Sequence, residues 1–324
     1  MQLNYINSNE MNQNKLQVRK TKKMFGLAVG CSILMLALLL SQNLFIGAVW
    51  SVIKTTELRI FFLIILSVLT LFFPFLILAK KAKISFSESL KVNTDVPNKF
   101  WLYIPFTIGA GFVVNIVIRI IFGPLLERFD YTESQLPSSV TGIILYFILA
   151  ALVPAIFEEW AFRGVLLRSL MPYGKGFALV VSSIIFGFMH LDPARVVFAT
   201  TFGLLAGFIY MKTGSIWYGA LIHLVNNAFA LTASFANKTN VDENVASPEA
   251  VLVTILMFSF IITAIIGIIY FAQKGYFKTR VMRYVTPPEK PKLQKSQYAR
   301  LSLLNLTTLA FVIIYLITVI FLYF

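Results

Sequence analysis

Long apolar runs separated by short polar stretches dominate the pattern of hydrophobic and polar positions along this chain. Nine such runs can be read, at about residues 25–50, 58–79, 101–122, 140–170, 177–190, 195–212, 216–236, 250–272 and 301–324. A helix needs about 20 apolar residues to cross the hydrocarbon core of a bilayer, and most of the runs approach or exceed that length. The fourth run is longer than a single membrane span needs, and the fifth is too short to cross the membrane. Because hydrocarbon offers no water to backbone groups, each run is predicted to be helical.

The composition agrees with this pattern, since 58% of the 324 residues are hydrophobic and only 13% are charged. A soluble domain cannot bury so large an apolar fraction. We therefore predict an all-α, polytopic membrane helical bundle with about eight or nine transmembrane helices and no β-sheet. The predicted organisation is a basic tail over 1–23, transmembrane helices and loops over 24–139, a core over 140–236, and C-terminal transmembrane helices over 237–324 with a basic loop at 273–300.

The net charge of +14 is distributed as a topology signal. Basic residues cluster before the first run, between the second and third, and in the loop 273–300, whereas acidic residues gather in the alternate loops. Basic loops remain in the cytoplasm, so the N-terminus is predicted to be cytoplasmic and the C-terminus to lie on the other side. The same distribution argues against a nucleic-acid partner and for the lipid bilayer, most simply a bacterial plasma membrane. The first run is long enough to span, so no cleaved signal peptide is expected.

Four ionisable side chains lie inside these apolar runs, where charge is costly. The chain has two histidines, His190 and His223, and both fall in apolar runs, as do Glu158 and Glu159. Ionisable groups within membrane helices usually serve a function, because they are expensive to place there. These four residues are therefore the first candidates for chemistry.

Helical spacing separates the two glutamates. Glu159 and Arg163 are four residues apart, the favoured spacing for an ion pair, and such a pair is expected to be structural. Glu158 points about 100° away from Glu159, so it has no local partner and is free to exchange a proton. Pro154, four residues before Glu158, is expected to kink the helix and free the carbonyl of Ala150.

The candidates can meet at one depth in the membrane. Glu158 and His190 lie at about 18 and 20 Å from the short turn that joins the fourth and fifth runs, at 1.5 Å per helical residue. His223 and Asn227 are four residues apart and share a helix face, while Asn226 points about 100° away and is a weaker candidate. We therefore expect Glu158, His190, His223 and Asn227 to face one cavity.

Other residues in this region have expected structural roles. Phe186, one turn before His190, is expected to support the site by packing. Asp192 is predicted to cap the next helix, with Pro193 in its first turn. Gly203 and Gly207 form a small-xxx-small pattern that predicts close helix packing.

Three motifs in this order resemble those of the intramembrane proteases related to the CAAX prenyl endopeptidase, the CPBP or Abi family. EEWAFR (158–163) is similar to the family's EExxxR, FGFMH (186–190) to its FxxxH, and HLVNN (223–227) to its HxxxN. The resemblance covers about residues 140–236, under a third of the chain. It implies hydrolysis of a peptide bond near the cytoplasmic side of the membrane. By the same resemblance Glu158 and His190 activate water, and His223 and Asn227 stabilise the oxyanion.

The resemblance leaves the cofactor open. The family is often described as metalloproteases, and Glu158, His190 and His223 are a plausible set of three ligands for zinc or another divalent metal, with water as the fourth. No HExxH motif is present, and metal-independent activation of water uses the same residues. We favour the metal-independent version. The implied partner is a membrane-delivered peptide or protein, and the resemblance extends to peptide maturation, bacteriocin self-immunity and prenylated C-termini without selecting among them.

Two other functions compete with the endopeptidase. One is a non-catalytic membrane scaffold that regulates a sensor kinase or an envelope enzyme. The other is a proton-coupled transporter, because Glu and His also build proton relays. Transporters often carry polar sites in both halves of a repeat, whereas here they occupy one central block, which disfavours the transporter.

Overall fold

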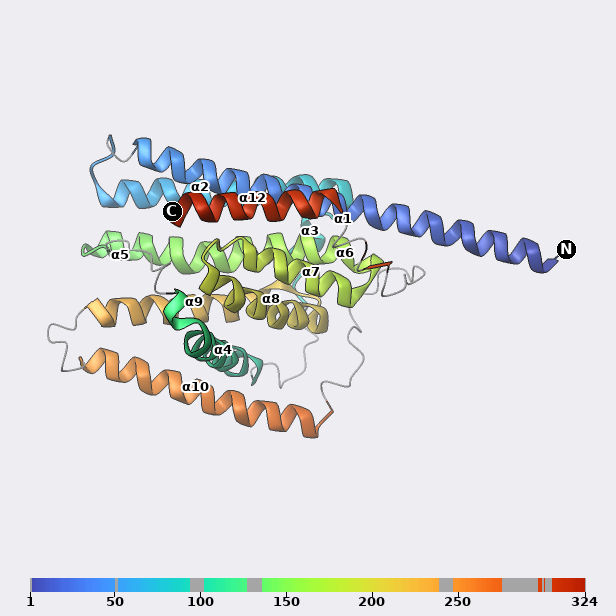
Figure 1. The fold of residues 1–324 in the computed structure, drawn as a ribbon. Coiled ribbons are helices and arrows are strands. Elements are labelled where there is room, and N and C mark those ends of the chain that lie inside the picture. The colour runs from blue at the N-terminus through green and yellow to red at the C-terminus, as the bar shows by residue number, and fades with distance from the viewer. Residues whose placement is uncertain are drawn as a thin grey trace.

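The computed structural model describes residues 2–49, 52–93, 102–126, 136–238, 247–275, 297, 298, 300 and 305–323. Within these ranges all regular structure is helical, and the long helices form a bundle in which most of them run side by side (Figure 1). They are α1 (Gln2–Val49), α2 (Thr56–Ala82), α4 (Tyr103–Leu126), α7 (Lys175–Phe188), α8 (Pro193–Thr213), α9 (Ile216–Lys238), α10 (Pro248–Gln273), α12 (Leu306–Tyr323) and a composite helix that begins with α5 (Val140–Phe147). The predicted all-α membrane bundle is confirmed.

The predicted apolar runs coincide with these helices. Among the described residues, seven helices are long and apolar enough to cross a membrane, whereas α7 and α12 are shorter apolar helices. The fifth run is thus too short to span, as predicted, although its helix ends at Phe188 rather than at His190. The basic residues before the first run are also helical, because α1 begins at Gln2 and has 48 residues, about 72 Å at 1.5 Å per residue. Its N-terminal part projects beyond the rest of the bundle (Figure 1).

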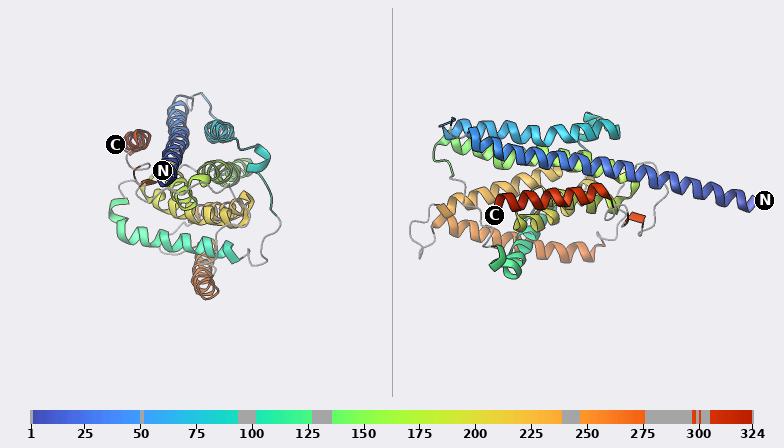
Figure 2. Two further views of the ribbon diagram at one scale, coloured as in Figure 1. Left: turned by 90° about the vertical axis from the view of Figure 1, so that its right-hand side faces the viewer. Right: turned by 45° about the horizontal axis from the view of Figure 1, so that its top comes forward.

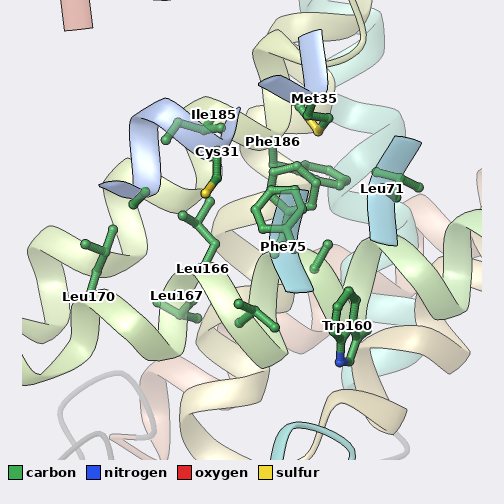
Figure 3. Close-up of a cluster of buried hydrophobic side chains, with 14 of the residues drawn as sticks. Cys31, Met35, Leu71, Phe75, Trp160, Leu166, Leu167, Leu170, Ile185 and Phe186 are labelled. Atoms are coloured by element: carbon green, nitrogen blue, oxygen red, sulfur yellow. The ribbon is translucent and has the colours of Figure 1, made fainter. Parts of the chain in front are cut away.

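The main core forms where α1 and α2 pack against the composite helix and α7 (Figure 3). Met35 of α1 and Phe75 of α2 are fully buried, and they meet Leu166 from the composite helix and Phe186 from α7 in one cluster. The opposite surface is apolar too, for example at Ile266 of α10, which is 60% exposed. An apolar surface of this extent belongs against lipid.

Glycines allow the helices around the site to approach closely. Gly203 of α8 lies against Ser183 of α7, where a Cβ atom would stand 3.0 Å from the Ser183 Cα, and Gly207 faces Leu179 in the same way. The small-xxx-small prediction is confirmed. In lipid, such close contact supplies the van der Waals packing that holds helices together.

A similar contact joins α4 to α10. Gly109 of α4 touches the backbone of Phe260 in α10, where a Cβ would lie only 2.0 Å from the carbonyl oxygen. Seen along the bundle, α4 lies inclined to its neighbours (Figure 2). This close approach therefore requires glycine, and it places α10 on the outside of the bundle.

The segment after α2 accepts hydrogen bonds from two helices that carry site residues. It contains the short helix α3 (Phe86–Ser89), which begins with a capping box formed by Ser85 and Glu88. The indole of Trp160 donates to the Ser89 hydroxyl at 3.0 Å, and the indole of Trp217 in α9 donates to the Leu90 carbonyl at 2.9 Å. These bonds fix the composite helix, at the residue after Glu159, and the start of α9 relative to each other.

Candidate active site

The composite helix that carries both glutamates is wound more loosely than an α-helix. Its turns are π-helical over η3 (Ile148–Leu152), η4 (Pro154–Glu158) and η5 (Trp160–Leu167), before α6 (Arg168–Leu170) and the 3₁₀ turn η6 (Met171–Tyr173) complete it. The prediction of a helix over this run is confirmed, whereas its π-helical winding was not predicted, because the helical spacing was taken as about 100° per residue. Pro154 has no N–H to donate to the preceding turn. Single π turns are frequent at functional sites.

Pro154 leaves the Ala150 carbonyl available, as predicted, and a side chain uses it. The Asn227 amide of α9 donates a hydrogen bond to the Ala150 oxygen at 3.2 Å. Asn226 in turn donates to the Asn227 side-chain oxygen at 3.1 Å. The Asn227 amide is therefore fixed at both its nitrogen and its oxygen, and one of its two N–H groups remains for another acceptor.

The predicted pair of Glu159 and Arg163 is present and fully buried. Arg163 Nη1 lies 2.7 Å from Glu159 Oε1, although it is off the line of an aligned hydrogen bond. Arg163 also donates to the Gly203 carbonyl at 3.4 Å, and its guanidinium lies 4.4 Å from the centre of the Phe186 ring. Its positive charge is thus compensated by a carboxylate, a carbonyl and an aromatic face.

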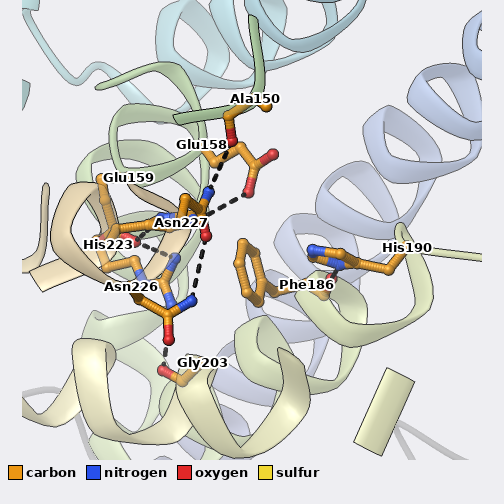
Figure 4. Close-up of polar contacts among 10 residues, drawn as sticks. Ala150, Glu158, Glu159, Phe186, His190, Gly203, His223, Asn226 and Asn227 are labelled. Atoms are coloured by element: carbon orange, nitrogen blue, oxygen red, sulfur yellow. Dashed lines mark hydrogen bonds and ion pairs between the residues drawn. The ribbon is translucent and has the colours of Figure 1, made fainter. Parts of the chain in front are cut away.

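The structure adds a contact that helical spacing did not predict, because Glu159 also holds His223. His223 Nδ1 lies 3.2 Å from Glu159 Oε1. On its other edge, His223 Nε2 lies 3.8 Å from Glu158 Oε2. The imidazole therefore lies between the two carboxyl groups (Figure 4). Glu159 takes part in the site as well as in the ion pair.

Glu158 is the least compensated group in the cluster. The residue is only 7% exposed, and Oε2 has no hydrogen-bond partner among the described residues. An unpartnered carboxyl oxygen in a buried place is costly. The expectation that Glu158 lacks a local partner on its own helix agrees with this geometry, and His223 Nε2 approaches the carboxyl from α9.

His190 lies just beyond the end of α7, next to the ring of Phe186. Its Nδ1 is 3.0 Å from the Phe186 carbonyl, which can only accept, so Nδ1 donates in this contact, and in the neutral imidazole Nε2 presents its lone pair. The rings of His190 and Phe186 are 5.1 Å apart, and those of His223 and Phe186 are 6.1 Å apart. Glu158 is near enough to His190 to interact with it electrostatically. Phe186 therefore contacts both histidines (Figure 4).

The turn after His190 has a conformation that is rare for a leucine. Leu191 has φ +61°, in the left-handed region, and the Asp192 N–H donates to the His190 carbonyl at 2.7 Å. The Asp192 side chain then accepts from the Arg195 backbone at 3.4 Å, and α8 begins at Pro193. The predicted start of α8 is confirmed. Strained backbone of this kind persists only where the surroundings hold it in place.

Sequence reasoning underestimated three contributors to this cluster. Asn226 was ranked below Asn227, yet it orients the Asn227 amide. Phe186 was assigned to packing, yet it also faces the Arg163 guanidinium. Gly219, one turn before His223, was not singled out, and a Cβ there would lie 2.6 Å from Glu159 Oε2. Its position four residues from a motif histidine was the available signal.

The predicted metal ligands are not gathered at coordination distance. Within the described ranges no group of three His, Cys, Asp or Glu side chains is close enough to hold a metal ion. The set of Glu158, His190 and His223 is divided, because His223 lies against the glutamates while His190 stands beyond the Phe186 ring. We therefore derive no chemical step through a metal.

Comparison with known proteins finds relatives of this same region. Residues 139–229 match the family model "Type II CAAX prenyl endopeptidase Rce1-like". A curated relative from Bacillus subtilis (strain 168), named "Putative membrane peptidase YdiL", is 33% identical over an alignment of 132 residues, and the alignment covers 38% of this chain. The match covers 53% of that relative, so the chain spans about half of its length. No solved structure matches the chain. The resemblance that the three motifs indicated is confirmed.

Proposed function

We propose, from a chain whose residues 139–229 match the type II CAAX prenyl endopeptidase family, that this protein is an intramembrane endopeptidase. It would hydrolyse a peptide bond in a peptide or protein delivered to the membrane. The observation that carries the proposal is the buried Glu158 carboxyl, which has one oxygen without a hydrogen-bond partner and lies 3.8 Å from His223 Nε2. A carboxyl in that setting can accept a proton from water and return it.

The reaction follows from these groups. Glu158 takes a proton from water while the water oxygen bonds to the carbonyl carbon of the substrate. The bare Nε2 of His190 accepts the second water hydrogen as a hydrogen bond, which orients the attack. As the tetrahedral intermediate collapses, the C–N bond breaks and Glu158 gives its proton to the leaving amine. The products are a carboxylic acid, which keeps the second water hydrogen, and an amine, and the Glu158 carboxylate is regenerated.

The oxyanion is stabilised by Asn227 and His223. Asn227 has one N–H left after its bond to Ala150, and preorganised donors of this kind typically lower the barrier by about 3–4 kcal/mol. His223 donates from Nε2 only when it carries protons on both nitrogens, because Nδ1–H is directed at Glu159.

A metal-dependent version uses the same residues, so it needs its own test. Purified protein would be analysed for zinc and assayed before and after chelation. The metal-independent version predicts activity without stoichiometric metal. Stoichiometric zinc that is lost together with activity would refute it.

The proposed location is the bacterial plasma membrane, with a cytoplasmic N-terminus and a C-terminus on the other side. The support is the distribution of basic residues between apolar runs. The test uses a Cys31→Ala background, since Cys31 is the only cysteine, with single cysteines introduced at Asn14 or Asn240. An impermeant maleimide is expected to label intact cells at position 240 only. Labelling at position 14 only would invert the topology.

The competing scaffold function makes a different prediction in cells. Glu158→Ala and His190→Ala each remove a proposed catalytic group, so neither variant is expected to restore the phenotype of a deletion strain. If both restore it fully at wild-type expression, catalysis is not the function. Aspartate at position 158 shortens the carboxyl side chain by one methylene and serves as the matched control, with partial rescue expected.

A further inference from the structure

A cavity of about 490 Å³ lies beside the N-terminal part of α1, away from the candidate active site. Its lining residues are Asn14, Lys15, Val18, Arg19, Lys22 and Gln297. Three of the six are cationic and none is acidic. Among the described residues, no acidic side chain forms an ion pair with these three cations. No acidic side chain among the described residues therefore compensates the positive charge of the cavity.

Helical spacing places the three cations of the cavity near one another on α1. Gln17, Thr21 and Phe25 are buried at four-residue spacing and turn one stripe of the helix toward the bundle. Lys15 and Lys22 lie within about 20° of each other on one flank of that stripe, at 100° per residue, and Arg19 lies about 40° from Lys15.

Two other cations continue the basic surface around the helix. Lys23 lies about 40° from Arg19 and Lys20 about 100°, and both are exposed, as are Lys15, Arg19 and Lys22. Neither Lys20 nor Lys23 lines the cavity. Three of the five cations of this basic segment therefore share one cavity, which a topology signal alone does not require.

The depth of the cavity matches the lipid headgroups. The apolar run of α1 begins at Met24, directly after the basic segment. At 1.5 Å per residue, Lys22 lies about 3 Å from that boundary, Arg19 about 8 Å and Lys15 about 14 Å. The polar zone of one leaflet is about 5–8 Å deep, so Lys22 and Arg19 fall at the level of the phosphates and Lys15 reaches just beyond them.

We propose that this cavity binds the phosphate headgroup of an anionic phospholipid. Arg19 offers a guanidinium fork suited to two phosphate oxygens, and Lys15 and Lys22 add compact charges on either side of it. Val18 supplies an apolar contact for the glycerol region, which a free phosphate ion lacks. The site is independent of the proposed peptidase function, because none of its residues belongs to the cluster around Glu158.

The test compares two triple variants that remove equal charge. K15Q/R19Q/K22Q empties the cavity of cations, whereas K20Q/K23Q/K81Q removes three exposed lysines that do not line it. Binding of phosphatidylglycerol and phosphatidylcholine to the purified full-length protein is measured by native mass spectrometry and by titration into detergent micelles. The first variant is expected to lose about tenfold or more in affinity for phosphatidylglycerol, and the control about threefold or less.

Three results would overturn the proposal, and a fourth applies if the triple variant does not fold. Equal losses in the two triple variants would mean that the attraction is diffuse, and equal binding of both lipids by the unmodified protein would mean that the headgroup charge is not recognised. Inorganic phosphate that binds as tightly as the lipid would identify a free anion as the ligand. If the triple variant does not fold, R19Q and R19K replace it, and R19K must keep more affinity than R19Q. The Glu158→Gln protein is expected to bind the lipid normally, which separates this test from that of catalysis.

Discussion

Arg163 offers the most demanding test of the site's architecture. We consider Arg163→Met, which keeps an unbranched apolar stem and deletes the guanidinium. The change removes the 2.7 Å ion pair with Glu159, the bond to the Gly203 carbonyl and the contact with the Phe186 ring. Glu159 stays buried with no exposed surface, and its Oε2 has no hydrogen-bond partner among the described residues. A buried charge is then left without its strongest partner.

The magnitude follows from that uncompensated charge. Removing one partner of a buried ion pair costs about 3–5 kcal/mol, whereas replacing both partners by neutral groups is often neutral or stabilising. We therefore expect Arg163→Met to lower the free energy of unfolding by about 3–5 kcal/mol. Adding Glu159→Gln should recover most of that loss, because the amide is neutral and its oxygen can still accept from His223.

The assay measures unfolding and peptidase activity on the same preparations. Chemical denaturation in mixed micelles gives the free energies of the wild type, both single variants and the double variant. The double variant is expected to be stable and poorly active, because the His223 ring then faces an amide in place of the Glu159 carboxylate. A loss below about 1 kcal/mol in Arg163→Met would refute the reasoning from buried charge. So would a double variant as unstable as that single variant.

Three further substitutions probe how the site is held. Asn226→Ala deletes the donor to the neighbouring amide, so kcat should fall about fivefold with little change in KM, as expected for a hydrogen bond of about 1 kcal/mol; an unchanged kcat would contradict this role. Pro154→Ala restores a backbone donor for the carbonyl four residues earlier and should lower kcat without lowering the unfolding temperature; reduced stability with full activity would count against it. Gly219→Ala places a Cβ 2.6 Å from Glu159 Oε2 and should abolish most activity, whereas Gly30→Ala, with nothing within 4 Å, should leave it unchanged. Equal effects of the two alanines on activity would show that the contact is unimportant.

The features that the sequence predicted correctly are those encoded locally. Apolar run length located the helices because a bilayer imposes one length scale. Four-residue spacing placed Glu159 beside Arg163, and the missing N–H of Pro154 identified Ala150 as a free carbonyl. Each of these inferences depends on neighbours within one helical turn.

The features that it missed depend on how separate helices meet. The contact of His223 with Glu159 joins residues 64 positions apart, and no local spacing encodes it. The π-helical winding around Glu158 also lay outside the prediction, because an apolar run reports that a helix forms and not how tightly it is wound. The position of His190 beyond the Phe186 ring was also missed, and α7 ends at Phe188, two residues before the predicted end.

The central claim is that Glu158 supports hydrolysis of a peptide bond in the membrane. The most direct measurement is comparative peptidomics of membranes from deletion cells that express either the wild-type protein or Glu158→Gln at equal levels. Glutamine keeps the size of the side chain and cannot carry the proton from water to the amine. We predict at least one peptide product that is present with the wild type and absent with Glu158→Gln. Identical peptide products in the two membranes, with the phenotype fully restored by Glu158→Gln, would contradict the account.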